Sequence, residues 1–182
     1  EKAGSRLAYG LLLVLLTVIV GGAKYSTVLF ALLVEALITA WTFWKKRGYR
    51  GTALFCFLLL LGCFAFSAVA PGNTVRAATL MGGVSAPVAI LQSFYFGFAL
   101  MGSWFSLPLL VVWALVAWQL SEALHGCAFK FNHPLWITIL SVCLFCAQLA
   151  PTIYTGNYLG DGRTINTYFY TFVLMSCALV LY

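Results

Sequence analysis

The most polar stretch of the sequence, residues 151–166 (PTIYTGNYLGDGRTIN), holds an acid and a base two positions apart among glycines. Asp161 suits a general base, a metal ligand or an ion-pair partner of Arg163. The other candidate binding residues in this stretch are Asn157, Tyr158 and Asn166. Tyr158 fits stacking on a sugar face or an aromatic belt at a membrane surface. The stretch as a whole fits a binding site or a plain loop.

A second group of residues with binding chemistry is the turn at positions 70–76 (APGNTVR). Its glycine lets a ligand approach the main chain. Arg76 offers a planar fork of donors that suits a phosphate or carboxylate, and Asn73 adds an amide. The turn therefore predicts an anion-binding site, or alternatively a helix-capping turn whose arginine reaches lipid phosphates.

A third candidate is Glu35, an acid in the middle of an apolar run. A carboxylate in such a run is costly and is by default a functional hypothesis. On a helix, Thr27, Thr39 and Thr42 share one polar stripe with it, because they fall within an arc of about 120°. Glu35 fits a catalytic or proton-coupling group, or a protonated side chain that hydrogen-bonds a neighbouring helix.

These residues lie in a chain that is too apolar for water. Of its 182 residues, 63% are hydrophobic and 8% are charged, well below the charge of a soluble domain. Five stretches contain no Asp, Glu, Lys or Arg, namely residues 7–23, 51–75, 77–121, 131–160 and 164–182. The runs are continuously apolar, which predicts an all-α polytopic membrane protein. Soluble enzymes, nucleic-acid-binding domains and disulfide scaffolds are excluded, and membrane lipids are the expected surroundings.

Apolar runs and breakers predict the crossings. We expect spans at about residues 7–22, 25–44, 51–70, 104–120 and 135–150, and from 167 to the end, with Pro71 and Pro151 ending two of them. Residues 79–101 form either an interfacial or re-entrant helix or another crossing. The total is six or seven transmembrane helices.

The basic residues orient the chain. Four of the ten lie in residues 45–50 (KKRGYR), which marks a cytoplasmic loop. Either treatment of residues 79–101 leaves seven basic residues inside and three outside, so the positive-inside rule favours neither. We prefer the single crossing between residues 77 and 121, because it places the turn at 70–76 and the stretch at 151–166 on the outer face.

The expected organisation is one transmembrane helical domain over residues 1–182, as part of a longer protein. Cys143 and Cys146 have metal-motif spacing but lie in an apolar run without a second pair, so we expect packing thiols. No metal site and no resident cofactor are predicted, although a divalent metal remains compatible with the acids.

The order of motifs resembles a family of bacterial multi-spanning membrane proteins of unknown function. That family is similar to GT-C-type lipid-dependent glycosyltransferases and to O-antigen-type polymerases. The matching residues are Gly22-Ala23-Lys24-Tyr25-Ser26, Ala70-Pro71-Gly72-Asn73 with Arg76, and Pro151 with Gly160-Asp161-Gly162-Arg163.

The resemblance implies an enzyme of the bacterial inner membrane that uses a polyprenyl-phosphate-linked sugar donor and a glycan acceptor of the cell envelope. Its arginines, here Arg76 and Arg163, would hold the donor phosphate, and an acid such as Asp161 would serve as base. In such enzymes the catalytic acid commonly lies in the first outer loop. Residues 21–26 contain no carboxylate, which departs from that pattern.

Two other classes fit the residues. A transporter or flippase for an anionic or lipid-linked substrate would use Glu35 for proton coupling and the same arginines for its cargo. A non-catalytic assembly subunit would tolerate replacement of all the loop residues.

Overall fold

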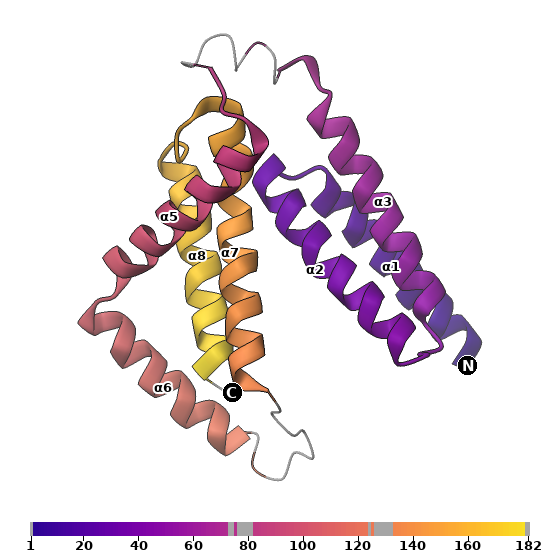
Figure 1. Ribbon diagram of the computed structural model, residues 1–182. Helices are drawn as coiled ribbons and strands as arrows, with labels where there is room; N and C mark the ends of the chain where they lie inside the picture. The colour runs from indigo at the N-terminus through magenta and orange to yellow at the C-terminus, as the bar shows by residue number, and fades with distance from the viewer. Residues whose placement is uncertain (1, 73–74, 76–81, 124, 126–132, 181–182) are drawn as a thin grey trace. The chain divides into compact units, whose positions relative to one another are not determined.

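The computed structural model describes residues 2–72, 75, 82–123, 125 and 133–180 (Figure 1). All regular secondary structure in these ranges is helical, which confirms the all-α class. The helices are α1 (Lys2–Gly21), α2 (Tyr25–Trp44), α3 (Arg50–Ala68), α5 (Ala86–Trp104), α6 (Leu107–Ala123), α7 (Pro134–Gly156) and α8 (Gly162–Val180).

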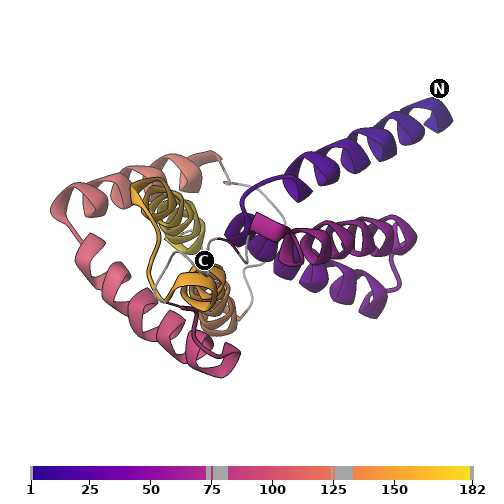
Figure 2. The ribbon, with the colours of Figure 1, turned by 90° about the horizontal axis from the view of Figure 1, so that it is seen from above.

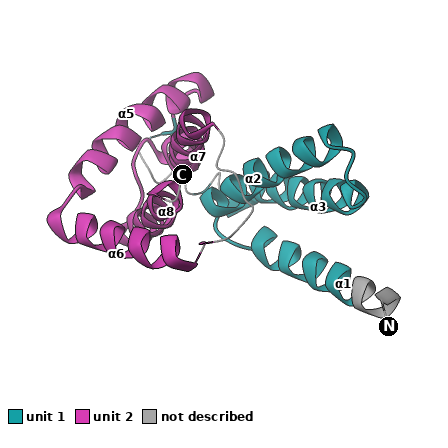
Figure 3. Cartoon of the chain, turned by 90° about the horizontal axis from the view of Figure 1, so that it is seen from below, with its two compact units in different colours: residues 1–83 teal, residues 84–182 magenta. Residues whose placement is uncertain are grey.

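The chain divides into two compact units, Glu1–Gly83 and Val84–Tyr182 (Figure 3). The first contains α1 to α3 and the second contains α5 to α8. The expected single transmembrane domain over residues 1–182 stays a prediction.

In the first unit, α2 and α3 form a close antiparallel pair, and α1 packs chiefly along α3. Val28, Leu32 and Leu60 form the buried cluster between the paired helices, and Tyr25 stacks on Phe64 with 4.9 Å between ring centroids. Seen from above, α1 diverges from the other two helices (Figure 2). The divergence leaves one side of α2 uncovered by α1.

In the second unit, α5 packs on α7, and α8 lies between α7 and α6. Phe145, Leu149 and Phe172 belong to a core that includes fully buried Tyr168. The indole N–H of Trp113 on α6 donates to the hydroxyl of Ser176 on α8 at 2.9 Å. This hydrogen bond ties α6 to the rest of the unit.

Four of the described helices, α2, α3, α5 and α7, are long and apolar enough to cross a membrane. Helices α1 and α6 have shorter apolar segments, Ala8–Gly21 and Leu107–Ala123. The structure therefore supports a helical membrane protein, and the count of six to seven crossings stays a prediction. By length and composition α5 fits a crossing better than α6, whereas the preferred prediction had residues 104–120 crossing and residues 79–101 interfacial or re-entrant.

Two predicted boundaries at the carboxyl end were wrong. Helix α7 continues through Pro151 to Gly156, and α8 begins at Gly162 instead of Thr167. Proline removes one helical hydrogen bond, the one that residue 151 would donate to the carbonyl of Ala147, and the helix continues without it. Two threonine hydroxyls hydrogen-bond other carbonyls nearby. Thr152 donates to the carbonyl of Leu149 at 2.8 Å, and Thr155 donates to that of Pro151 at 2.9 Å.

Candidate functional site

The loop between α7 and α8 is only five residues long, Asn157 to Asp161, and two positive φ angles shape it (Figure 1). Asn157 has a φ of 50° and its N–H donates to the carbonyl of Ile153 at 2.8 Å, which closes α7. Asparagine is one of the residues that tolerate this left-handed capping position. Gly160 has a φ of 96°, which turns the chain into α8.

Asp161 caps α8 and presents its side chain to the outside of the unit. Its carbonyl accepts the N–H groups of Thr164 at 2.8 Å and Ile165 at 3.1 Å, which places it at the N-cap. Its carboxylate accepts a hydrogen bond from the hydroxyl of Tyr158 at 3.3 Å, and the residue is exposed. Asp161 therefore has a structural role at the N-cap of α8, which the sequence did not reveal. Its carboxylate is open to a ligand.

Arg163 and Asn166 lie on the first turn of α8, three residues apart and both exposed. Residues at this spacing share a helix face. No ion pair joins Arg163 to Asp161 within the described ranges, so the interaction considered from their spacing is not formed. The guanidinium and the amino end of α8 both favour an anion at this face.

The structure thus gathers five of the predicted site residues at one end of the second unit: Asn157, Tyr158, Asp161, Arg163 and Asn166. Asn73 and Arg76, the other predicted substrate ligands, lie outside the described residues. Glu35, the second predicted catalytic acid, belongs to the first unit and stands in a separate pocket.

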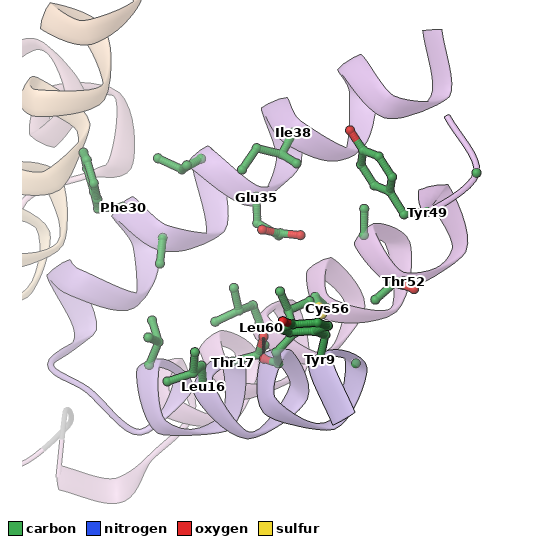
Figure 4. Close-up of a pocket in the computed structure, with 17 residues that line it drawn as sticks. Tyr9, Leu16, Thr17, Phe30, Glu35, Ile38, Tyr49, Thr52, Cys56 and Leu60 are labelled. Atoms are coloured by element: carbon green, nitrogen blue, oxygen red, sulfur yellow. Dashed lines mark hydrogen bonds between the residues drawn. The ribbon is translucent and has the colours of Figure 1, made fainter. Parts of the chain in front are cut away.

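That pocket has a volume of about 1130 Å³ and lies among α1, α2 and α3 (Figure 4). Glu35 points into it from α2, while Tyr9 and Thr17 face it from α1 and Thr52 and Cys56 from α3 (Figure 4). Glu35 has no hydrogen bond and no ion pair with the described part of the chain. The alternative in which it bonds a neighbouring helix is therefore not what this structure forms.

Only part of the polar stripe on α2 is buried. Thr39 and Thr42 are buried, and the Thr42 hydroxyl donates to the carbonyl of Thr39 at 2.8 Å. Glu35 lies between Thr42 and Thr39 on the same helix face, but it is only half-buried and lines the pocket. A group that would otherwise be enclosed between helices thus faces open space.

The residues that surround Glu35 were not predicted from the sequence. Tyr9, Thr17, Tyr49 and Thr52 supply hydroxyl groups to the pocket wall. The available signal was the spacing of Thr52, Cys56 and Leu60, four residues apart on one helix face. Spacing alone does not show that such a face borders a hollow.

Metal ligands do not gather within the part of the chain that the structure describes: no three His, Cys, Asp or Glu residues come together there. Cys143 and Cys146 are free thiols. Cys146 is buried against Gly97, as expected for a packing residue, whereas Cys143 is exposed.

Comparisons with protein-family models, curated proteins and solved structures gave no match.

Proposed function

We propose that this chain is a membrane-embedded glycosyltransferase of the bacterial inner membrane that uses a polyprenyl-phosphate-linked sugar donor. The observation that carries the proposal is the short loop between α7 and α8 together with the start of α8, residues 157–166, where an open carboxylate, a guanidinium and two amides come together. These groups follow directly on α7, which is apolar and long enough to cross a membrane. A loop in that position meets the head group of a lipid-linked donor at the membrane surface.

Each group has a role that its chemistry suits. Asp161 accepts the proton of the acceptor hydroxyl, whose oxygen then bonds the anomeric carbon of the sugar. The bond between that carbon and the donor phosphate breaks, and the polyprenyl phosphate leaves with the electron pair. Arg163 holds the leaving phosphate. Asn157, Asn166 and Tyr158 position the sugar, and Tyr158 also orients Asp161 through the 3.3 Å hydrogen bond.

The test is sugar transfer by the purified protein in lipid nanodiscs. Polyprenyl-phosphate-linked sugars and an envelope glycan are supplied, and released polyprenyl phosphate is measured. Loss of the charged hydrogen bonds in Arg163→Ala should slow release about 10–100-fold. Arg47→Ala, at the exposed turn after α2, should keep the full rate. Equal rates in the wild type and Arg163→Ala would remove the assignment.

A transporter is the second candidate, and the position of Glu35 favours it. An acid that faces an open space inside an apolar helix group is typical of a coupling group. Transport of an anionic cargo would be measured in proteoliposomes as uptake that Glu35→Gln abolishes and that Arg163→Ala, which removes a cargo ligand, weakens. Sugar transfer that Arg163→Ala slows and Glu35→Gln leaves unchanged favours the transferase.

A further inference from the structure

One acidic side chain, and no described basic one, lines the pocket in the first unit. Among the described residues that line it, Glu35 is the only Asp, Glu, Lys, Arg or His. It lies ten residues from both Tyr25 and Lys45, so about 15 Å of helix separates it from either end of α2. The carboxylate therefore stands midway along a helix that is apolar enough to span a membrane.

The rest of the wall is apolar and aromatic. Leu13, Leu16, Val34 and Ile38 form much of it, and Tyr9 and Phe30 add ring surfaces on different helices (Figure 4). The volume of about 1130 Å³ slightly exceeds the roughly 300–1,000 Å³ range of small-molecule sites. A bulky apolar ligand fits such a space.

The charge of Glu35 determines which kind of apolar ligand the pocket can bind. A phosphate or carboxylate brought to this depth would meet Glu35 as a like charge, and no basic residue is among the described lining residues to offset it. A cation gains from the same carboxylate and from aromatic faces. Lys45, Lys46, Arg47 and Arg50 lie in the nearby turn but do not line the pocket, and they are exposed. Arg47 is stacked over Trp41, 5.4 Å from its ring centroid.

We propose that the pocket among α1, α2 and α3 binds a lipophilic organic monocation, with Glu35 as its counter-ion. The proposal concerns binding and holds for a transferase and for a transporter alike, because no residue of the α7–α8 loop lines the pocket. A site for a cation is also distinct from a site for the anionic head group of a polyprenyl-linked donor.

Binding of radiolabelled tetraphenylphosphonium to the purified full chain in neutral detergent tests the proposal. The wild type should bind one cation per chain in a saturable manner. Glu35→Gln should weaken binding at least tenfold, whereas Glu35→Asp should retain part of it. Glu122→Gln, which removes an exposed acid on α6, should bind like the wild type.

Two further measurements keep the result specific to this pocket. Leu13→Trp fills the space and leaves the carboxylate in place, so it should also weaken binding. Neutral triphenylphosphine oxide should not compete with the cation. Both results retain their meaning even where Glu35→Gln fails to fold, which size-exclusion chromatography reveals.

Several outcomes would overturn the proposal. These are absence of saturable binding, equal affinity in folded Glu35→Gln, and full competition by the neutral analogue. Retention of a phospholipid that the cation does not displace would assign the pocket to an acyl chain. Protection of Leu13→Cys from labelling in a dimer would assign it to a second copy of the chain. Transfer and binding use different residues, so their failures are distinguishable.

Discussion

At the scale of single residues, backbone conformation sets the geometry of the proposed transfer site. Gly160 adopts a φ of 96°, and a β-carbon built on it would lie 2.7 Å from the β-carbon of Thr164. Thr164 is itself fully buried, so it has little room to shift. The turn that carries Asp161 and Arg163 therefore depends on glycine at this position.

The first prediction concerns this glycine. Gly160→Ala should destabilise the protein by about 1–2 kcal/mol, because an L-residue pays for a left-handed conformation, and it should also reduce sugar transfer. The measurement is the unfolding midpoint in SDS, followed by circular dichroism. Gly162→Ala is the matched control, since nothing lies within 4 Å of its β-carbon and its φ is not positive. Equal midpoints for the two variants would contradict the prediction.

The hydrogen bond between Tyr158 and Asp161 is a smaller effect of the same kind. Both residues belong to the loop, and the 3.3 Å separation is long for a hydroxyl donor to a carboxylate. This hydrogen bond mainly orients the carboxylate and adds little to the stability of the fold. The rate of transfer is consequently more sensitive to Tyr158 than the fold is.

At the scale of helices, the second unit depends on a close approach of α5 and α7. A β-carbon at Gly97 would lie 2.6 Å from the sulfur of Cys146, and both residues are buried. Small residues are what allow membrane helices to pack at this distance. The α5–α7 contact in turn supports α7, which carries the loop.

The second prediction tests that approach. Gly97→Ala should destabilise the unit by about 1–3 kcal/mol through overpacking, measured as the SDS unfolding midpoint. Gly102→Ala on the same helix meets nothing within 4 Å and should be neutral or stabilising.

Removal of the Cys146 sulfur tests whether this atom causes the destabilisation in Gly97→Ala. The double variant Gly97→Ala with Cys146→Ala should be less destabilised than the sum of the two single variants. Simple additivity would show that the sulfur is not the obstacle.

The helices themselves were predictable where charges flank an apolar run. The bounds of α2, Tyr25–Trp44, match the expected span, because Lys24 and Lys45 close it on both sides. The end of α7 was not predictable, because one hydrogen bond lost at Pro151 does not by itself end a helix that is well packed. Leu149 and Ile153, on either side of the proline, are fully buried, and this tertiary packing is not visible in the local sequence.

The sites were predictable to different degrees for related reasons. Residues 157–166, the loop and the start of α8, are close in sequence, so their position at one place could be predicted. The surroundings of Glu35 depend on how α1 diverges from α2, a tertiary feature that no local pattern encodes. The predicted participation of Arg76 and Asn73 in the transfer site stays a prediction.

At the scale of the whole molecule, the scarcity of charge limits which groups can do chemistry. The chain has 4 acidic and 10 basic residues among 182. Two of the acids, Glu35 and Asp161, stand at the pocket and at the α7–α8 loop. The two proposed activities thus divide the acids between the two compact units, with cation binding in the first and sugar transfer in the second.

The transferase proposal also requires a definite orientation. A polyprenyl-linked sugar is used at the outer surface, so the loop between α7 and α8 must face outward, while the basic turn after α2 faces the cytoplasm. The number of crossings between these two positions decides whether both conditions hold.

The most direct test is cysteine labelling in cells, in a variant from which the six native cysteines have been removed. Single cysteines are introduced as Asn157→Cys, Asp161→Cys and Arg47→Cys, and a membrane-impermeant maleimide is applied to intact cells. The account predicts that positions 157 and 161 react from outside and that position 47 reacts only after permeabilisation. Labelling of 157 and 161 only after permeabilisation would place the loop in the cytoplasm and contradict the proposed transfer site.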